Sequence, residues 1–143
     1  MLAYRVVARL DVKGENLIKG VQFEGLRVLG KQADFASKYA KDGADEILFI
    51  DTVASLYGRN QLESLIEETS SQAFIPFTVS GGIRSLAQVR HLCEHGADRI
   101  ALNTWAVKEP EIIKEISETW GCQAITVSIE AKRVNGGWEA YTD

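Results

Sequence analysis

Five short apolar runs alternate with longer amphipathic stretches along this chain, a pattern typical of repeated strand–helix units around a parallel sheet. In the longer stretches, apolar residues recur at three- and four-residue spacing, as one buried face of a helix requires. The runs predict strands at residues 5–11, 46–51, 77–80, 99–103 and 124–130, and the amphipathic stretches predict helices at residues 32–42, 61–71, 85–95 and 109–119. A small hairpin is predicted at residues 14–23, in the longer connection after the first strand.

Residues that favour helix ends support these boundaries. Ser85 begins one predicted helix as an N-cap, Gly96 stands where that helix should stop, and Gly43 stands where an earlier helix should stop. These glycines also belong to a weak internal repeat, because Gly43-Ala44-Asp45 and Gly96-Ala97-Asp98 each lead from a helix into a strand. The copies lie two strand–helix units apart, so the chain resembles a doubled element.

The composition fits one globular domain over residues 1–143. The chain is 45% hydrophobic and 25% charged, and a chain of this length buries roughly two-thirds of its unfolded surface. A net charge of −4 without a long run of one sign argues against a nucleic-acid partner. No apolar stretch approaches the roughly 20 residues that span a bilayer, and no signal-peptide pattern follows Met1. We therefore expect a cytoplasmic protein with no membrane partner.

The carboxyl ends of the predicted strands carry most of the candidate chemistry, because these ends and the loops after them form the active face of a parallel strand–helix array. Ser80, Gly81 and Gly82 make a turn between a strand and a helix, and such a turn exposes backbone N–H groups that hold a phosphate. Asn103 and Thr104 follow the next strand and add amide and hydroxyl donors beside it. A tight turn without a ligand is the alternative interpretation of the Gly-Gly pair.

Two carboxyl groups, Asp11 and Glu130, end different predicted strands on the inward side. If the sheet curls into a barrel, they face each other across its mouth, and carboxyls in unlike surroundings divide general acid and general base roles. The alternative for each is a strand-end cap or a salt bridge to a lysine. Asp51 ends a strand on the outward side, so we expect it to cap the next loop.

His91 and His95 have the i, i+4 spacing of a zinc-binding pair on a helix. The sequence offers no third ligand beside them, so a solvated helix face is the favoured interpretation. We expect no metal and no cofactor.

Several motifs together resemble one known family. They are Leu10-Asp11-Val12-Lys13, Lys19-Gly20-Val21, Phe23-Glu24-Gly25-Leu26-Arg27, Gly43-Ala44-Asp45-Glu46, Ser80-Gly81-Gly82-Ile83, Gly96-Ala97-Asp98, Leu102-Asn103-Thr104 and the stretch from Ala131 to Trp138. The chain resembles, along its whole length, the cyclase subunit of imidazole glycerol phosphate synthase, a TIM-type (β/α)8 barrel of histidine biosynthesis. A barrel of the same family that amidinates a nucleotide sugar is a less favoured alternative, because the segments 23–27 and 132–138 stay close to the cyclase pattern.

The resemblance implies a reaction in which ammonia from a partner glutaminase meets phosphoribulosyl-formimino-aminoimidazole carboxamide ribonucleotide. The products are imidazole glycerol phosphate and aminoimidazole carboxamide ribonucleotide. By the same resemblance, Asp11 is an acid/base group, Lys19 a substrate-loop lysine, and Gly82, Asn103 and Thr104 one of two phosphate sites. Charged residues at the amino ends of the strands complete the implied site: Arg5, Glu46 and Arg99 gate ammonia entry, and Asp98 lies at the glutaminase interface.

Three residues depart from the family pattern. Glu130 stands in place of a catalytic aspartate, and one added methylene matters because a misplacement of about 1 Å in a catalytic group can cost roughly a hundredfold in rate. Ser80 replaces the first glycine of a Gly-Gly-Gly turn. Arg9 points into the barrel, where a charge needs a partner. We hypothesise that Arg9 pairs with an interior carboxylate and obstructs the ammonia path.

The sequence contains five predicted strands where the family barrel has eight strand–helix units. We therefore expect residues 1–143 to form the N-terminal half of the barrel. A half-barrel leaves unpaired strand edges and an apolar concave face, both of which favour association. We expect a homodimer or a higher oligomer, and we retain a non-catalytic, self-associating phosphate-binding half-barrel as the alternative function.

Overall fold

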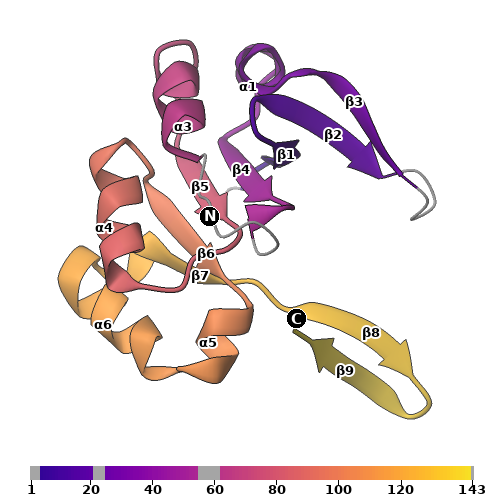
Figure 1. Cartoon of the computed structure of the whole chain (residues 1–143), viewed down its shortest axis with the longest axis vertical. Helices are drawn as coiled ribbons and strands as arrows, with labels where there is room; N and C mark the ends of the chain where they lie inside the picture. The colour runs from indigo at the N-terminus through magenta and orange to yellow at the C-terminus, as the bar shows by residue number, and fades with distance from the viewer. Residues whose placement is uncertain (1–3, 21–24, 55–61, 143) are drawn as a thin grey trace.

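A seven-stranded sheet forms the centre of the protein, in a computed structural model that describes residues 4–20, 25–54 and 62–142. Five of its strands are parallel and lie in chain order. They are β1 (Val7–Lys13), β4 (Glu46–Asp51), β5 (Phe77–Ser80), β6 (Arg99–Leu102) and β7 (Ile125–Val127). Two antiparallel strands, β2 (Asn16–Gly20) and β3 (Leu26–Lys31), extend the sheet beyond β1. A separate hairpin of β8 (Glu130–Val134) and β9 (Gly137–Tyr141) projects away from this body (Figure 1).

The helices line the outer face of the curved sheet, and within the described ranges no helix covers the opposite, concave face of the parallel strands (Figure 1). They are α1 (Gln32–Lys41), α3 (Leu62–Ser70), α4 (Leu86–Glu94), α5 (Thr104–Lys108) and α6 (Glu111–Trp120), with a short 3-10 turn at Cys122–Ala124. Within the described ranges, none of these helices is both long and apolar enough to cross a bilayer. The predicted α/β fold with a parallel sheet is confirmed.

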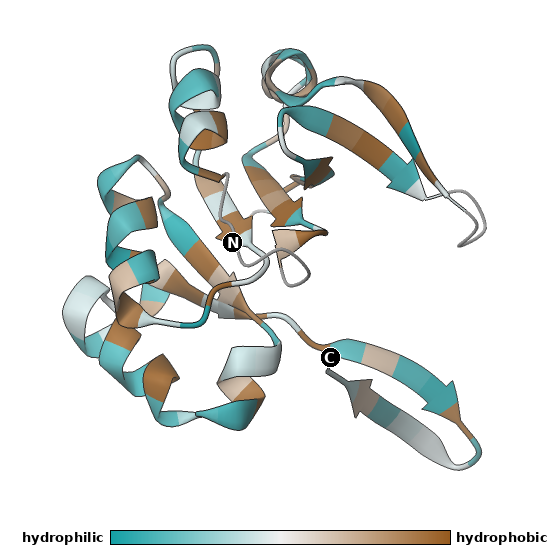
Figure 2. Ribbon diagram, in the orientation of Figure 1, coloured by the Kyte–Doolittle hydropathy of each residue, from teal (hydrophilic) through white to brown (hydrophobic). Residues whose placement is uncertain are grey.

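The core lies between the helices and the outward side of the strands. Ile47, Phe49 and Val79 on the strands, and Ile66 and Ile116 on the helices, are fully buried. Figure 2 shows hydrophobic residues concentrated on the central strands and on the helix faces beside them. The helical periodicity of the sequence thus identified the buried faces of the helices, and on the strands the buried residues alternate because successive side chains point to opposite sides of the sheet.

The predicted boundaries agree with the structure in the centre of the sheet and differ at its ends. Strands β4 and β5 begin and end where predicted, whereas β1 lies two residues further along the chain. The fifth strand, predicted at residues 124–130, is limited to Ile125–Val127, because Ala124 belongs to a 3-10 turn and Glu130 begins the separate hairpin. Helix α5 was not predicted, and α6 begins after Pro110 rather than at residue 109.

The predicted hairpin at residues 14–23 is only partly testable, since residues 21–24 lie outside the described ranges. Its first strand is β2, and the second strand, β3, extends to Lys31, well past the predicted end. The prediction of a small hairpin on a loop was therefore wrong in extent: the two strands continue the main sheet as far as the start of α1.

The internal repeat has a structural explanation. Asp45 accepts the backbone N–H of Val6 at 2.7 Å through its carboxylate and donates its own N–H to the Val6 carbonyl at 2.8 Å. Asp98 makes the same pair of bonds to Phe77, at 2.8 and 2.9 Å. The preceding glycines, Gly43 and Gly96, adopt positive φ angles of 97° and 112°, which end the helix and turn the chain back to the sheet. The aspartate of each copy of the repeat thus makes two hydrogen bonds to the backbone at the beginning of the neighbouring strand.

We expect Asp98→Ala to lower the free energy of unfolding by about 1–3 kcal/mol, because it leaves the backbone N–H of Phe77 without its acceptor at a part-buried position. Urea unfolding followed by circular dichroism measures the change. Asp98→Asn retains an acceptor oxygen at the same place, so it should recover most of the loss. Equal losses in the two variants would show that the hydrogen bond is not the cause.

Candidate active site

A cavity of about 250 Å³ lies on the concave face of the parallel strands, lined by inward-pointing residues of all five. Its centre is apolar and includes Leu48 and Ile50 of β4. Its ends are polar, because Glu46 and Arg99 line it near the amino ends of the strands and Ser80 near the carboxyl ends. The cavity therefore extends along the strands from one set of predicted site residues to the other.

Glu46 organises the amino end of the cavity. Its side chain is only 7% exposed, and one carboxylate oxygen lies 2.5 Å from Nη1 of Arg99 and 3.3 Å from Nη1 of Arg5. The other oxygen accepts a hydrogen bond from the hydroxyl of Thr78. Arg99 is held further by the bond from its Nε to the carbonyl of Gln123, 3.1 Å long. The structure thus brings together three predicted residues, Arg5, Glu46 and Arg99, in one ion-paired cluster, and Thr78 is a member that the sequence analysis missed.

Asp98 lies at the same end of the strands but serves β5. The carboxylate of Asp98 accepts the backbone N–H of Phe77, as described above, and Asp98 is exposed. Asp98 therefore lies at the amino ends of the strands, as predicted, and has a local structural role there.

Asp11 lies near the carboxyl end of β1 and is paired with Arg9. Nε of Arg9 donates to the Asp11 carboxylate at 2.7 Å, and the two side chains are 60% and 37% exposed. Residues two apart on a strand project to the same side, so this pair shares the inward side of β1. The predicted pairing of Arg9 with a carboxylate is found, with Asp11 as the partner, but the pair is exposed rather than buried, and the obstruction of an ammonia path stays a hypothesis.

The turn Ser80-Gly81-Gly82 packs tightly against the loop that follows β4. Gly81 has a φ of 107°, and a Cβ atom there would lie 2.3 Å from the carbonyl oxygen of Asp51. Gly82 has a φ of 63°, and its Cβ would lie 2.5 Å from the Cβ of Ala54. Ser80 is buried and donates to the carbonyl of Ala101 at 3.0 Å. Both glycines are thus required by the local packing, whether or not the turn also holds a phosphate.

Asp51 caps the loop after β4, as predicted for a residue of outward orientation. Its carboxylate accepts the backbone N–H groups of Val53 and Ala54, both at 3.0 Å. Burial raises the pKa of Asp51, and these two amide bonds oppose the shift without cancelling it. The carboxyl is therefore part of the scaffold beneath the Gly81 turn.

Two of the other predicted binding residues follow the neighbouring strand at this end, and the third lies on the antiparallel extension of the sheet. Asn103 is the N-cap residue of α5 and Thr104 is its first residue; they follow β6, which pairs with β5 beside the glycine turn. Lys19 lies on β2, opposite Arg27 of β3, and is exposed. Adjacent parallel strands end at one edge of a sheet, so the Ser80 turn and Asn103 share that edge.

Glu130 does not end a strand of the main sheet, contrary to the prediction. It begins β8, where it pairs with Tyr141, and its side chain is exposed. The reason is that β7 stops at Val127, and the chain then leaves the sheet for the projecting hairpin. The inward orientation expected from counting residues along one continuous strand therefore does not apply to Glu130.

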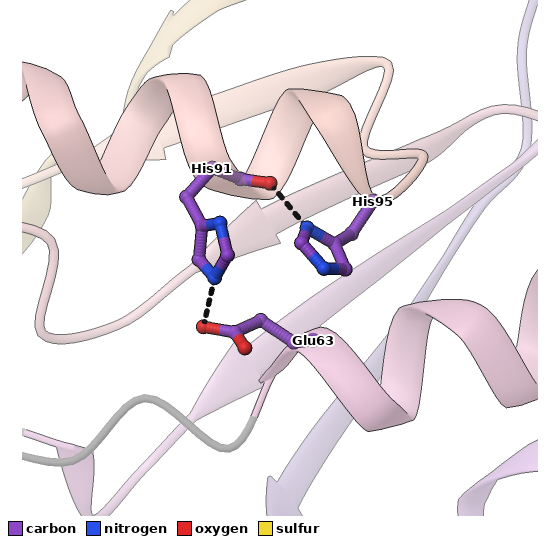
Figure 3. A group of neighbouring side chains, drawn as sticks. All are labelled: Glu63, His91 and His95. Carbon is purple, nitrogen blue, oxygen red and sulfur yellow. Dashed lines mark hydrogen bonds and ion pairs between the residues drawn. The ribbon is translucent and has the colours of Figure 1, made fainter.

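The histidine pair has a neighbour that the sequence analysis did not name. His91 lies on α4, His95 is the C-cap residue of that helix, and Glu63 of α3 reaches them, so that one ligand atom from each of the three residues lies within 4.8 Å of the others (Figure 3). The sequence analysis missed Glu63 because it lies on a different helix, 28 positions before His91. His91 is exposed, as expected for a solvated helix face, but a third candidate ligand lies beside the pair.

Comparison with known proteins gives a family match along the chain. The family model described as "Histidine biosynthesis protein" matches residues 5–143. The imidazole glycerol phosphate synthase subunit HisF of Legionella pneumophila is 53% identical over 140 residues, which cover 97% of this chain and 66% of that protein. The subunits of the same name from Solibacter usitatus and Metallosphaera sedula are 44% and 43% identical, each over 99% of this chain and 56% of their own length. The chain thus spans between about half and two-thirds of the length of these curated relatives.

Proposed function

The chain belongs to the histidine biosynthesis family, among the cyclase subunits of imidazole glycerol phosphate synthase, and on this premise we propose that it supplies the N-terminal part of a cyclase active site. The reaction is the conversion of phosphoribulosyl-formimino-aminoimidazole carboxamide ribonucleotide and ammonia to imidazole glycerol phosphate and aminoimidazole carboxamide ribonucleotide. Residues 1–143 are one incomplete domain, the first part of a (β/α)8 barrel.

The observation that carries this proposal is the cavity along the concave face. At the amino end of the cavity, Glu46 holds Arg5 and Arg99 in an ion-paired cluster. At the carboxyl end, the lining residue Ser80 is the first residue of the glycine turn. The apolar stretch between the two ends suits ammonia, a small neutral molecule that enters from a glutaminase subunit docked near Asp98. The cluster around Glu46 then acts as the gate.

At the carboxyl end, Asp11 acts as the acid/base group and the substrate phosphate binds to the backbone of Gly81 and Gly82 with Asn103 and Thr104. The dipole of α4 supports an anion there, since α4 follows the turn and begins after the N-cap Ser85, which accepts the N–H of Gln88 at 3.2 Å. Lys19 provides a positive charge from β2. Glu130 is proposed as the second acid/base group, which requires the β8–β9 hairpin to approach Asp11.

A direct test measures binding of imidazole glycerol phosphate to the 143-residue chain by titration calorimetry. We expect Asn103→Ala to weaken binding by at least about tenfold, the effect of losing one or more hydrogen bonds worth 0.5–1.5 kcal/mol each, or more to a charged group. Gln72→Ala removes an exposed amide from the loop between α3 and β5 and is the matched control. Equal binding by both variants would contradict the phosphate site.

A second measurement separates the enzyme from its alternative. With ammonium salt as the nitrogen source, an active chain forms imidazole glycerol phosphate, and Asp11→Asn abolishes that turnover. If the parent binds the phosphate compound without turnover, the alternative of a non-catalytic phosphate-binding half-barrel is favoured.

The Arg9–Asp11 ion pair is the observation that favours the non-catalytic alternative, because a substrate must displace Arg9 to use the Asp11 carboxylate. Arg9→Cys frees the Asp11 carboxylate, so turnover above the parent is expected; no gain would refute the obstruction.

We also propose that the 143-residue chain forms a homodimer. Within the described ranges, β3 and β7 are the two edges of the main sheet, and exposed apolar side chains follow both: Val28 and Leu29 on β3, Val127 on β7 and Ile129 just beyond. Unpaired edges with apolar side chains favour association. Light scattering should give twice the chain mass, and Val127→Lys should shift the species toward monomer. A stable monomer of the parent would refute the proposal.

A further inference from the structure

Two carboxylates and two imidazoles face each other between α3 and α4, on the outer face of the protein, away from the cavity. Nε2 of His91 lies 2.8 Å from a carboxylate oxygen of Glu63, and Nε2 of His95 lies 3.6 Å from one of Glu67. The residues are four apart on each helix, so both pairs lie on the facing sides of neighbouring helices. Figure 3 shows the rings of His91 and His95 side by side, with Glu63 reaching toward them. The ring centroids are 4.3 Å apart.

The hydrogen bond of His95 to the backbone determines which of its nitrogens is free. Nδ1 of His95 lies 2.7 Å from the carbonyl oxygen of His91. A carbonyl only accepts hydrogen bonds, so Nδ1 carries the proton, and the lone pair of the neutral ring is on Nε2. That nitrogen lies 3.6 Å from a carboxylate oxygen of Glu67, which is also an acceptor. A cation between the two acceptors, either a proton or a metal ion, turns their repulsion into attraction.

We propose that Glu63, His91 and His95 bind a divalent transition-metal ion, with zinc as the best fit, and that Glu67 supports the site. Two imidazoles and one carboxylate are a donor set that zinc takes in proteins, with a fourth position left to water. The bond from Nδ1 of His95 to a backbone carbonyl is the orienting contact typical of metal-binding histidines. Two histidines four apart on one helix face are a known arrangement for the same ion.

The geometry requires only small side-chain movements to complete the site. The three ligand atoms already lie within 4.8 Å of one another, and tetrahedral zinc with bonds of 2.0–2.1 Å separates its ligands by about 3.4 Å. The side chains of His91 and Glu63 are 47% and 38% exposed, so they have room to rotate, and solvent reaches the fourth position. Because the ligands come from two helices, a bound ion also links two successive strand–helix units.

The test uses the full, untagged 143-residue chain, stripped of metal with a chelator and titrated with zinc chloride in a calorimeter. We expect one zinc per chain. Glu63→Gln and His95→Gln should each weaken binding by at least the 10–100-fold that loss of an orienting partner costs, and Glu67→Gln should weaken it less. Glu118→Gln, which removes an exposed carboxylate on α6, is the matched control and should bind as the parent does. Circular dichroism without zinc should be the same for all of these variants, since every substituted side chain is on the surface.

Two further measurements make the result specific. The parent should melt at a higher temperature with excess zinc, because a ligand that binds only the folded state stabilises it, and Glu63→Gln should lose that shift. Cobalt(II) in place of zinc should give a d–d absorption spectrum without a thiolate charge-transfer band. Zinc affinity that is unchanged in Glu63→Gln and His95→Gln, a thiolate band from Cys93 or Cys122, or no zinc binding by the parent would each overturn the proposal. Proton-mediated pairing alone would then account for the cluster.

Discussion

Gly81→Ala is expected to lower the free energy of unfolding by about 3–5 kcal/mol, although the substitution adds only one methyl group. Two costs combine. An L residue at a φ of 107° is strained by about 1–3 kcal/mol, and the new Cβ would meet the carbonyl oxygen of Asp51 at 2.3 Å. Backbone must move to relieve that contact, which adds the roughly 1–3 kcal/mol of an overpacked site.

Gly136→Ala separates these two costs. Gly136 has a φ of 93°, close to that of Gly81, but nothing lies within 4 Å of the position its Cβ would take. This variant should therefore lose only about 1 kcal/mol, from backbone strain. Urea unfolding followed by circular dichroism, at one protein concentration because association changes the apparent stability, measures both. Similar losses for the two variants would show that the contact with Asp51 is relieved without cost.

Glu46→Ala is expected to lower the free energy of unfolding by about 2–4 kcal/mol. The substitution removes the acceptor of the buried Thr78 hydroxyl and the nearest counter-charge of Arg99, whose side chain is 25% exposed. A buried hydroxyl without a partner costs about 1–3 kcal/mol, and a partly buried guanidinium adds a share of the 3–5 kcal/mol seen when a fully buried pair is broken. Arg5 adds little, since it is mostly exposed.

Two controls locate the origin of this effect. Glu46→Gln retains an acceptor for Thr78 and should lose less than Glu46→Ala. Glu118→Ala breaks the exposed pair with Lys114, 3.9 Å apart, and should change stability by at most about 0.5 kcal/mol. Urea unfolding at low and high salt measures both, and the loss in Glu46→Ala should be nearly independent of salt because the carboxylate is shielded from solvent. A loss no greater than that of Glu118→Ala would contradict the ion-paired cluster.

Local signals in the sequence predicted most of the central fold. The bounds of β4 and β5 were exact because their apolar runs are short and flanked by turn residues, and Ser85 was correctly placed as the N-cap of α4. The repeat at Asp45 and Asp98 was also visible, although its reason, a reciprocal pair of backbone hydrogen bonds, required the structure. The motifs around Asp11 and Gly82 indicated the family that the comparisons then showed.

Contacts between elements far apart in the chain could not be predicted from the sequence. Counting alternate positions placed Glu130 on the inward side of a long fifth strand, whereas the strand ends at Val127 and the chain turns into a hairpin. Nothing near His91 and His95 in the sequence pointed to Glu63, because the packing of α3 on the same side of the sheet as α4 brings them together.

The sequence by itself determined the alternation of strands and helices, the buried faces of the helices and the family, because these depend on residue periodicity and on short motifs. Only the tertiary structure decided the distant partners: Glu46 with Arg99 and Thr78, and Gly81 with the Asp51 backbone. The physical reason is that ion pairs and close packing act over a few ångströms, and residues 30 to 53 positions apart reach that range only once strand register and packing are fixed.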